Sequence, residues 1–257
     1  MYEKIIFEKN PPRATIKLNS PEVQNALSVK MLNEIKDALS KVENDEEVIV
    51  LVIDSVGEHF CSGIDIRDVG ELSAIEGRKI AKLLRKTFAQ IRYLEKPVIA
   101  KIRGNCLGAG LEIALSCDFL IGSEDSAYGF PHMKIGIPSI VEAGIIPYAV
   151  GIFRAKELFF IPKFWDAKRA YNEGILYRVC QKEDIDSAVD ELADTLSQQS
   201  PLAMSLQKEI SNKWITSDLE NAIDFSVNTV CISFASEDQK EGMRAFLQKR
   251  KPKFKGK

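Results

Sequence analysis

The sequence predicts an α/β core followed by a helical C-terminal region. Strand-like and helix-like patterns alternate through roughly the first 150 residues, as expected for repeated strand and helix units. Val48–Ile53 is a continuous apolar run, which is typical of a strand buried on both faces. From Arg154 onward the pattern is almost wholly helical.

The N-terminal part predicts a βαβ unit. Two short strands are expected at Ile5–Phe7 and Ala14–Leu18, joined by a turn at Asn10–Pro12. Apolar residues then recur at helical spacing from Leu27 to Val42, with Ser28 as a candidate N-cap. The buried strand Val48–Ile53 completes the unit, whose crossover we expect to be right-handed.

The later elements are predicted from the spacing of apolar residues and from residues that end helices, such as proline. The sequence predicts a long helix over 71–94, ended by Lys96 and Pro97, then a buried strand at 97–102 and a further strand at 119–122. A mixed segment, 126–146, precedes a short helix. Further amphipathic helices are expected at 155–160, 167–171, 186–196, 202–210, 219–234 and 238–247. No Gly/Ser-rich linker occurs, so we expect a core over 1–195 and a helical region over 196–257 that is not independent.

Composition narrows the class of protein. A chain of 257 residues with 45% hydrophobic residues suits a globular protein, and a net charge of −2 gives no support for a nucleic-acid partner. The five cysteines are odd in number and lack metal-ligand spacing, which favours a reduced, cytoplasmic setting. No apolar run reaches the ~18 residues of a membrane span, and the N-terminus lacks signal-peptide features. Two histidines argue against a histidine-based metal site.

The stretch Gly104–Asp118, GNCLGAGLEIALSCD, predicts a sharp turn that starts a helix. Glycines at 108 and 110 allow close approach to the main chain. The first amides of a helix lack intrahelical partners and carry the positive end of its dipole, so they can hold an anion, including a transient one. Glu112 lies one turn in. It is either a catalytic acid or an acid that only complements the dipole.

Several motifs in order along the chain resemble the crotonase superfamily, the enoyl-CoA hydratase/isomerase group. The resemblance covers nearly the whole chain. It is carried by LNSPEVQNAL (18–27), FCSGIDI (60–66), KPVIAKIRGNCLGAGLEIALSCD (96–118), FPHMKIGIPS (130–139) and EDQKEGMRAFLQKRKPKF (237–254).

This resemblance implies a crotonase-type ββα spiral core with a helical C-terminal trimerisation region, assembled as a homotrimer or homohexamer. It implies an acyl-CoA thioester substrate, with coenzyme A as part of the substrate and no separate cofactor. By position, the backbone N–H groups of Ile64 and Ala109 match the family's oxyanion hole. Such donors stabilise the thioester enolate by roughly 3 kcal/mol each.

The resemblance assigns the first catalytic glutamate to Glu112, but the second is replaced. Family hydratases have a Pro-Glu pair where this chain has Pro131-His132. A neutral imidazole can still exchange protons near pH 7, and His132 is either a catalytic group or a filler in a diverged site. Glu142 is either the second carboxylate or an acid at a helix start.

The CoA-binding residues are also implied by the resemblance. Ser62, Ile64, Asp65 and Ile66 match the adenine-binding stretch. Phe246 and Lys249 match an aromatic and a lysine that hold the adenine and phosphates, often from a neighbouring subunit. Lys249 is otherwise a solvated charge of the basic tail.

Three functions remain open at this stage. The first is hydration of a 2-enoyl-CoA, with Glu112 positioning the water. The second is another crotonase reaction on an acyl-CoA, such as isomerisation, decarboxylation or thioester hydrolysis, favoured by the loss of the second glutamate. The third is a non-catalytic acyl-CoA-binding homologue. We expect neither a nucleic acid nor a membrane as a partner.

Overall fold

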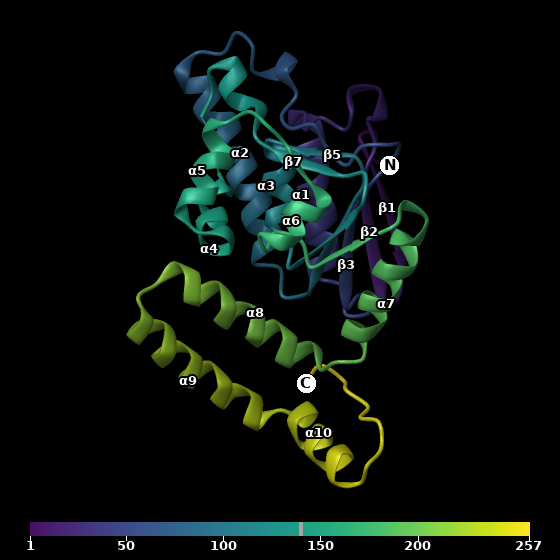
Figure 1. The fold of residues 1–257 in the computed structure, drawn as a ribbon. Coiled ribbons are helices and arrows are strands. Elements are labelled where there is room, and N and C mark those ends of the chain that lie inside the picture. Colours follow the sequence, from purple (N-terminus) through teal and green to yellow (C-terminus); the bar gives the residue numbers. More distant parts are fainter. Residues whose placement is uncertain (139–140) are drawn as a thin grey trace.

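The computed structural model describes residues 1–138 and 141–257, and it places one mixed sheet at the centre of the core (Figure 1). Within the described residues the sheet has the order β1-β2-β3-β4-β6-β9. Strand β1 pairs with β2 in antiparallel fashion, and every later pair is parallel. The strands are β1 (Ile5–Asn10), β2 (Arg13–Leu18), β3 (Val50–Ser55), β4 (Val98–Ile102), β6 (Phe119–Ser123) and β9 (Arg178–Cys180).

The predicted βαβ unit is confirmed. Helix α1 (Val29–Glu43) connects β2 to the parallel strand β3, and the Ser28 hydroxyl caps it by accepting from the Met31 amide. Side chains of β3 alternate between two buried clusters: Leu51 and Ile53 face one, and Val50 and Val52 face the other. Burial on both faces is the reason that this strand is a continuous apolar run.

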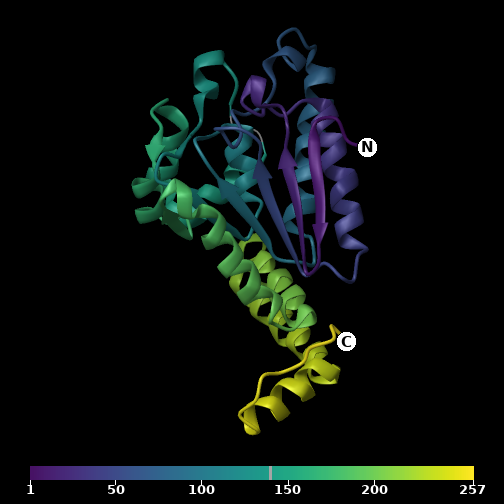
Figure 2. The same ribbon diagram turned by 90° about the vertical axis from the view of Figure 1, so that its right-hand side faces the viewer.

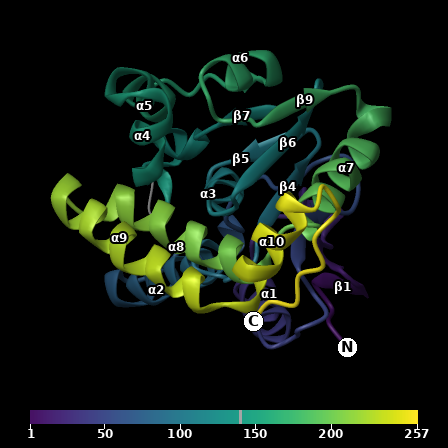
Figure 3. The ribbon, with the colours of Figure 1, turned by 90° about the horizontal axis from the view of Figure 1, so that it is seen from below.

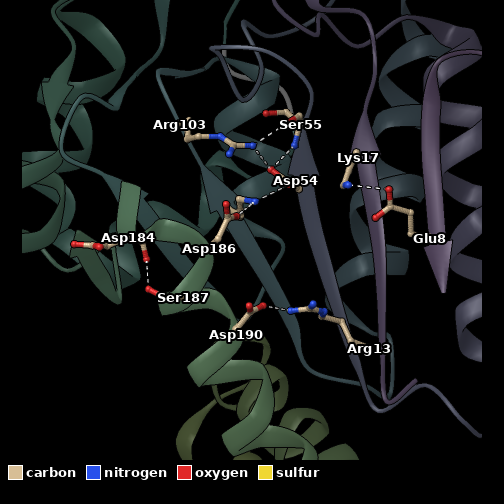
Figure 4. Close-up of polar contacts among 11 residues, drawn as sticks. Glu8, Arg13, Lys17, Asp54, Ser55, Arg103, Asp184, Asp186, Ser187 and Asp190 are labelled. Carbon is tan, nitrogen blue, oxygen red and sulfur yellow. Dashed lines mark hydrogen bonds and ion pairs between the residues drawn. The ribbon is translucent and has the colours of Figure 1, made fainter. Parts of the chain in front are cut away.

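Helices cover both faces of the sheet. Helices α1 and α2 (Ala74–Arg92) pack on one face with the larger core, and α7 (Ile185–Ser197) packs on the other (Figure 2). Polar contacts also join α7 to the sheet: Arg13 of β2 pairs with Asp190 of α7 (Figure 4), and Lys101 of β4 pairs with Asp186 of α7. Lys101 also donates to the buried Asp54 at 2.9 Å, so this cluster holds α7 across the strands.

The structure also contains a second, smaller sheet. It has the order β5-β7-β8, formed by β5 (Asn105–Leu107), β7 (Ala127–Gly129) and β8 (Trp165–Asp166). Strand β5 falls within the stretch predicted to be a loop before a helix, and helix α3 (Ala109–Leu115) then begins as predicted. The expectation of an almost wholly helical chain after Arg154 is wrong at β8 and β9, because strands of two or three residues show no period in the sequence.

The remaining elements are short 3-10 turns and further helices. Within the described residues, 3-10 turns occur at Pro21–Val23, Ile66–Asp68, Pro131–Ile135, Ala143–Ile145 and Lys182–Asp184. In the segment predicted to be mixed, positions 139 and 140 lie outside the described residues. The other helices are α4 (Ile146–Val150), α5 (Ile152–Phe160), α6 (Ala167–Asn172), α8 (Pro201–Thr216), α9 (Leu219–Ala235) and α10 (Glu237–Leu247).

Helices α8, α9 and α10 extend away from the sheet (Figures 1 and 2), and the view from below shows α8 and α9 side by side (Figure 3). They expose an unusual number of large apolar side chains: Trp214, Leu219, Ile223, Val227, Val230, Ile232, Phe234, Met243, Phe246 and Leu247. In the described parts of the chain, no helix combines the length and apolar character needed to cross a membrane.

Candidate active site

The residues predicted to form the oxyanion hole come together beside one cavity. A cavity of about 190 Å³ is lined by Ile64 and Ala109 together with Glu112 and His132. Its other lining residues are mostly apolar: Ser62, Gly63, Ile66, Leu84, Gly108, Phe130, Pro131, Ile135, Ile137 and Pro138. An apolar cavity with a few convergent polar groups is the usual form of a small-molecule site.

Two backbone segments meet at this cavity because of a glycine. Gly63 has φ +119°, a conformation that L side chains rarely adopt. A Cβ atom at Gly63 would lie 3.3 Å from the Leu107 carbonyl oxygen and 3.6 Å from the Ala109 nitrogen. Glycine therefore lets the chain segment that carries Ile64 lie directly against the start of α3.

The amides of Ile64 and Ala109 are available to a ligand. Ala109 is the first residue of α3, where an amide has no intrahelical acceptor. Across the described ranges 1–138 and 141–257, neither amide donates a hydrogen bond to another backbone or side-chain group. The neighbouring amides of Leu27 and Asp65 do bond across this junction, at 2.8 and 3.1 Å, which holds the segment around Ile64 in place.

Glu112 is buried at the same cavity and is held by main-chain donors. It is 3% exposed and lies in the first turn of α3. Its Oε2 atom accepts hydrogen bonds from the amides of Val141 and Glu142, each at 2.9 Å. Two amide donors stabilise a carboxylate and restrict its orientation. Sequence patterns did not indicate Val141, because it donates to Glu112 through its backbone amide, which every residue except proline has.

His132 lies in the 3-10 turn Pro131–Ile135 and also lines the cavity. Its ring meets the Phe130 ring edge-on, with centroids 5.4 Å apart. Burial lowers the pKa of His132 below its ordinary value of 6.5, because desolvation disfavours the charged imidazolium. The imidazole is therefore mainly neutral at pH 7.

The Glu142 side chain points to a different neighbour. It is 3% exposed, and its Oε2 atom accepts from Arg92 Nη1 at 2.8 Å. It lines a separate cavity of about 480 Å³, together with Arg78, Arg85 and Arg92. Burial raises the pKa of Glu142, while the charges of Arg92 and Arg85 oppose that rise. Glu142 precedes the 3-10 turn Ala143–Ile145 but makes no side-chain cap there.

The residues predicted to bind CoA occupy three places. Ser62, Ile64 and Ile66 line the cavity of Glu112, whereas Asp65 faces a neighbouring cavity of about 520 Å³. Phe246 is 82% exposed near the end of α10, and Lys249 follows that helix. Helix α10, which contains Phe246 and precedes Lys249, is one of the helices that extend away from the sheet (Figure 1).

The cavity beside Asp65 contains cations that the sequence patterns did not indicate. Lys4, Lys30 and Arg67 line it together with Ser28. The Arg67 guanidinium pairs with Asp65 and lowers the pKa of that carboxyl. These cations come from separate parts of the chain and share no local motif, so only the fold brings them together. Metal-ligand clusters of three or more His, Cys, Asp or Glu side chains do not occur in the described residues.

Known proteins match this chain over almost its full length. A profile of the enoyl-CoA hydratase/isomerase family matches residues 9–257. Crotonyl-CoA hydratase of Syntrophomonas wolfei subsp. wolfei is 37% identical over 255 residues, covering 98% of each chain. Short-chain-enoyl-CoA hydratase of Clostridium acetobutylicum is 34% identical over 249 residues, covering 96% of this chain and 95% of the relative.

Solved structures match equally well. An enoyl-CoA hydratase structure from Geobacillus kaustophilus has a TM-score of 0.95 at 33% identity, covering 100% of this chain and 99% of that one. An enoyl-CoA hydratase structure from Bacillus anthracis has a TM-score of 0.94 at 28% identity, covering 99% and 100%. The predicted crotonase-type fold is confirmed, and the chain belongs to the enoyl-CoA hydratase/isomerase family.

Proposed function

We propose that this protein adds water across the double bond of a 2-enoyl-CoA thioester. The observation that carries the proposal is Glu112, a buried carboxylate oriented by two backbone amides at a cavity that also contains the Ile64 and Ala109 amides. The hydratase relatives support hydration over the other crotonase reactions. The acyl-CoA substrate class follows from the same family.

The chemistry needs a stabilised enolate and one proton transfer. Addition of the water oxygen to C3 forms a C–O bond and moves electron density onto the thioester oxygen, where the amides of Ile64 and Ala109 donate hydrogen bonds. Glu112 accepts the proton that the water loses and returns it to C2, which restores the thioester carbonyl. Atoms and charge therefore balance with a single carboxylate.

His132 and Glu142 have different parts in this proposal. The neutral imidazole of His132 accepts a hydrogen bond from the attacking water, because it lines the same cavity as Glu112. Glu142 contributes its backbone amide to Glu112, and its side chain binds Arg92. The second catalytic glutamate of the family is then not needed as a second proton carrier.

The CoA moiety is held by two groups of residues in this proposal. Ser62, Ile64 and Ile66 contact the part nearest the thioester, and Asp65 lies toward the adenine, where Lys4, Lys30 and Arg67 supply positive charge for the phosphates.

Phe246 and Lys249 reach the CoA bound to a neighbouring subunit of a homotrimer or homohexamer. The exposure of Phe246 on α10 and of Lys249 just after it, together with the apolar surface of α8 to α10, supports this assembly. We place the enzyme in the cytoplasm, where its five unpaired cysteines stay reduced.

The test is steady-state turnover of crotonyl-CoA beside a 3-enoyl-CoA, with Glu112→Gln as the variant. We expect hydration of crotonyl-CoA, and a fall in kcat of about 10²- to 10⁴-fold in Glu112→Gln, since general acid–base catalysis contributes that much. The amide is isosteric, so thermal unfolding serves as the control for folding. Turnover of only the 3-enoyl substrate, or full hydratase activity in the variant, would refute hydration by Glu112.

A further inference from the structure

We propose that Arg92 is a positioning residue: its ion pair with Glu142 holds the backbone amides that orient the Glu112 carboxylate. The inference rests on the proposed role of Glu112 and extends it to a residue on another helix. Arg92 is the last residue of α2, and it lies outside the cavity that contains Glu112 and His132.

Glu142 contacts both Arg92 and Glu112, the first through its side chain and the second through its backbone amide. Its backbone N–H donates to Glu112 Oε2 at 2.9 Å, beside the parallel bond from Val141. Its side chain accepts from Arg92 Nη1 at 2.8 Å. A displacement of Glu142 therefore moves its own amide, one of the donors to the Glu112 carboxylate, and disturbs the adjacent amide of Val141.

Arg92 is needed because the Glu142 carboxylate is buried. A buried carboxylate without a partner is strongly unfavourable, so it moves toward solvent or takes up a proton. Within the described residues, Arg92 is the cation that makes an ion pair with Glu142, although Arg85 lines the same cavity. Removal of the guanidinium is expected to release the side chain of Glu142 and, with it, the backbone amides of 141 and 142.

Arg92 is itself firmly anchored. Its carbonyl oxygen accepts from Asn212 Nδ2 of α8 at 3.0 Å, and its guanidinium lies 4.9 Å from the centre of the Tyr93 ring. Lys208 of α8 donates to the carbonyl oxygens of Ile91 and Lys96, at 3.3 and 3.0 Å. Helix α8 thus fixes the C-terminal end of α2. The Arg92–Glu142 ion pair in turn fixes residues 141 and 142, whose amides donate to Glu112.

The experiment compares Arg92→Met with Arg92→Lys on a 2-enoyl-CoA. We expect Arg92→Met to lower kcat by about 10- to 100-fold, because a small misplacement of a catalytic group has effects of that order, with KM changed less than about threefold. Arg92→Lys keeps the charge and is expected to recover part of the loss. Arg78→Met is the matched control, since Arg78 is an exposed residue of α2 that lines the same cavity and forms no ion pair within the described residues. It should retain full kcat.

Two further measurements keep the proposal testable if Arg92→Met folds poorly or the substrate is wrong. Glu142→Gln, a neutral isostere, is expected to lower kcat less than Arg92→Met, and the double variant should lose no more than Arg92→Met alone, since both act through one contact. A crystal structure of Arg92→Met should show the 141 and 142 amides displaced from Glu112.

The outcomes separate the positioning role from the proposed reaction. Undiminished kcat in Arg92→Met, a loss confined to KM, or unchanged amide contacts in its crystal structure would each overturn the role of Arg92. If the wild-type enzyme hydrates no 2-enoyl-CoA while the variant structure shows displaced amides, the proposed function fails and the positioning role stands.

Discussion

At the scale of single residues, the site combines a buried carboxylate with a neutral imidazole. Amides of Val141 and Glu142 donate to Glu112, and His132 lines the same cavity at the position where the family resemblance implies a second glutamate. Burial lowers the pKa of His132, which keeps a hydrogen-bond acceptor beside the carboxylate near pH 7. The replacement therefore changes the number of carboxylates but retains a group able to contact water.

The protonation of His132 can be measured directly. We expect an NMR titration to give a His132 midpoint below 6.5, with the signal assigned by its loss in His132→Gln. At pH values between that midpoint and 6.5, His132 is protonated to a greater extent in the unfolded chain than in the folded chain. The free energy of unfolding therefore falls as the pH decreases through this interval. A midpoint at or above 6.5 would contradict the effect of burial.

At the scale of secondary-structure elements, the site depends on how closely α3 approaches its neighbours. A Cβ atom at Gly110 would lie 2.4 Å from the Cys61 carbonyl oxygen and 2.7 Å from the Cys61 Cβ. Glycine therefore lets the first turn of α3 contact the segment before Ile64. This packing places the Ala109 amide and Glu112 on the same side as Ile64.

Gly110→Ala tests this packing. We expect the free energy of unfolding to fall by about 1–3 kcal/mol, the usual effect of an overpacked core, together with a loss of activity as α3 shifts. Urea denaturation and steady-state turnover measure the two effects. Gly77→Ala in α2 is the control, because a Cβ there meets nothing within 4 Å. It should be neutral or stabilising by up to about 1 kcal/mol. Equal stability of both variants would argue against the close approach.

At the scale of the whole molecule, the core and the C-terminal helices differ in surface character. The sheet buries its apolar residues between α1 and α2 on one side and α7 on the other. Helix α9, in contrast, exposes Val227 (57%) and Val230 (46%), and α10 exposes Phe246 and Leu247. An apolar surface of this extent is typical of an interface between protein chains.

Assembly is expected to depend on this surface. Analytical ultracentrifugation of the wild-type protein should give a molar mass of about three or six times the 28.8 kDa chain mass. Val227→Asp should shift the distribution toward smaller species, since it places a charge on the apolar surface of α9. Ile75→Asp, the same kind of change at an exposed position of α2, should leave the mass unchanged. A monomeric wild-type protein would refute the assembly.

Much of the fold could be predicted from local pattern. The apolar run of β3, the Ser28 cap of α1 and the helical periods of α2 and α7 to α10 are properties of contiguous residues, and the structure has elements in all those places. Strands β5, β7, β8 and β9 were missed because two or three residues show no period. They exist because they pair with distant strands, as β9 does with β6.

The sequence by itself determined the family, the α/β core and the identity of the candidate residues Ile64, Ala109, Glu112 and His132, because motifs are read along the chain. Tertiary structure alone decided what each group faces. Glu142 turns its side chain to Arg92 and its amide to Glu112, and Lys4, Lys30 and Arg67 line one cavity. The physical reason is that burial, ion pairing and main-chain hydrogen bonds arise between segments far apart in sequence, where no local pattern records them.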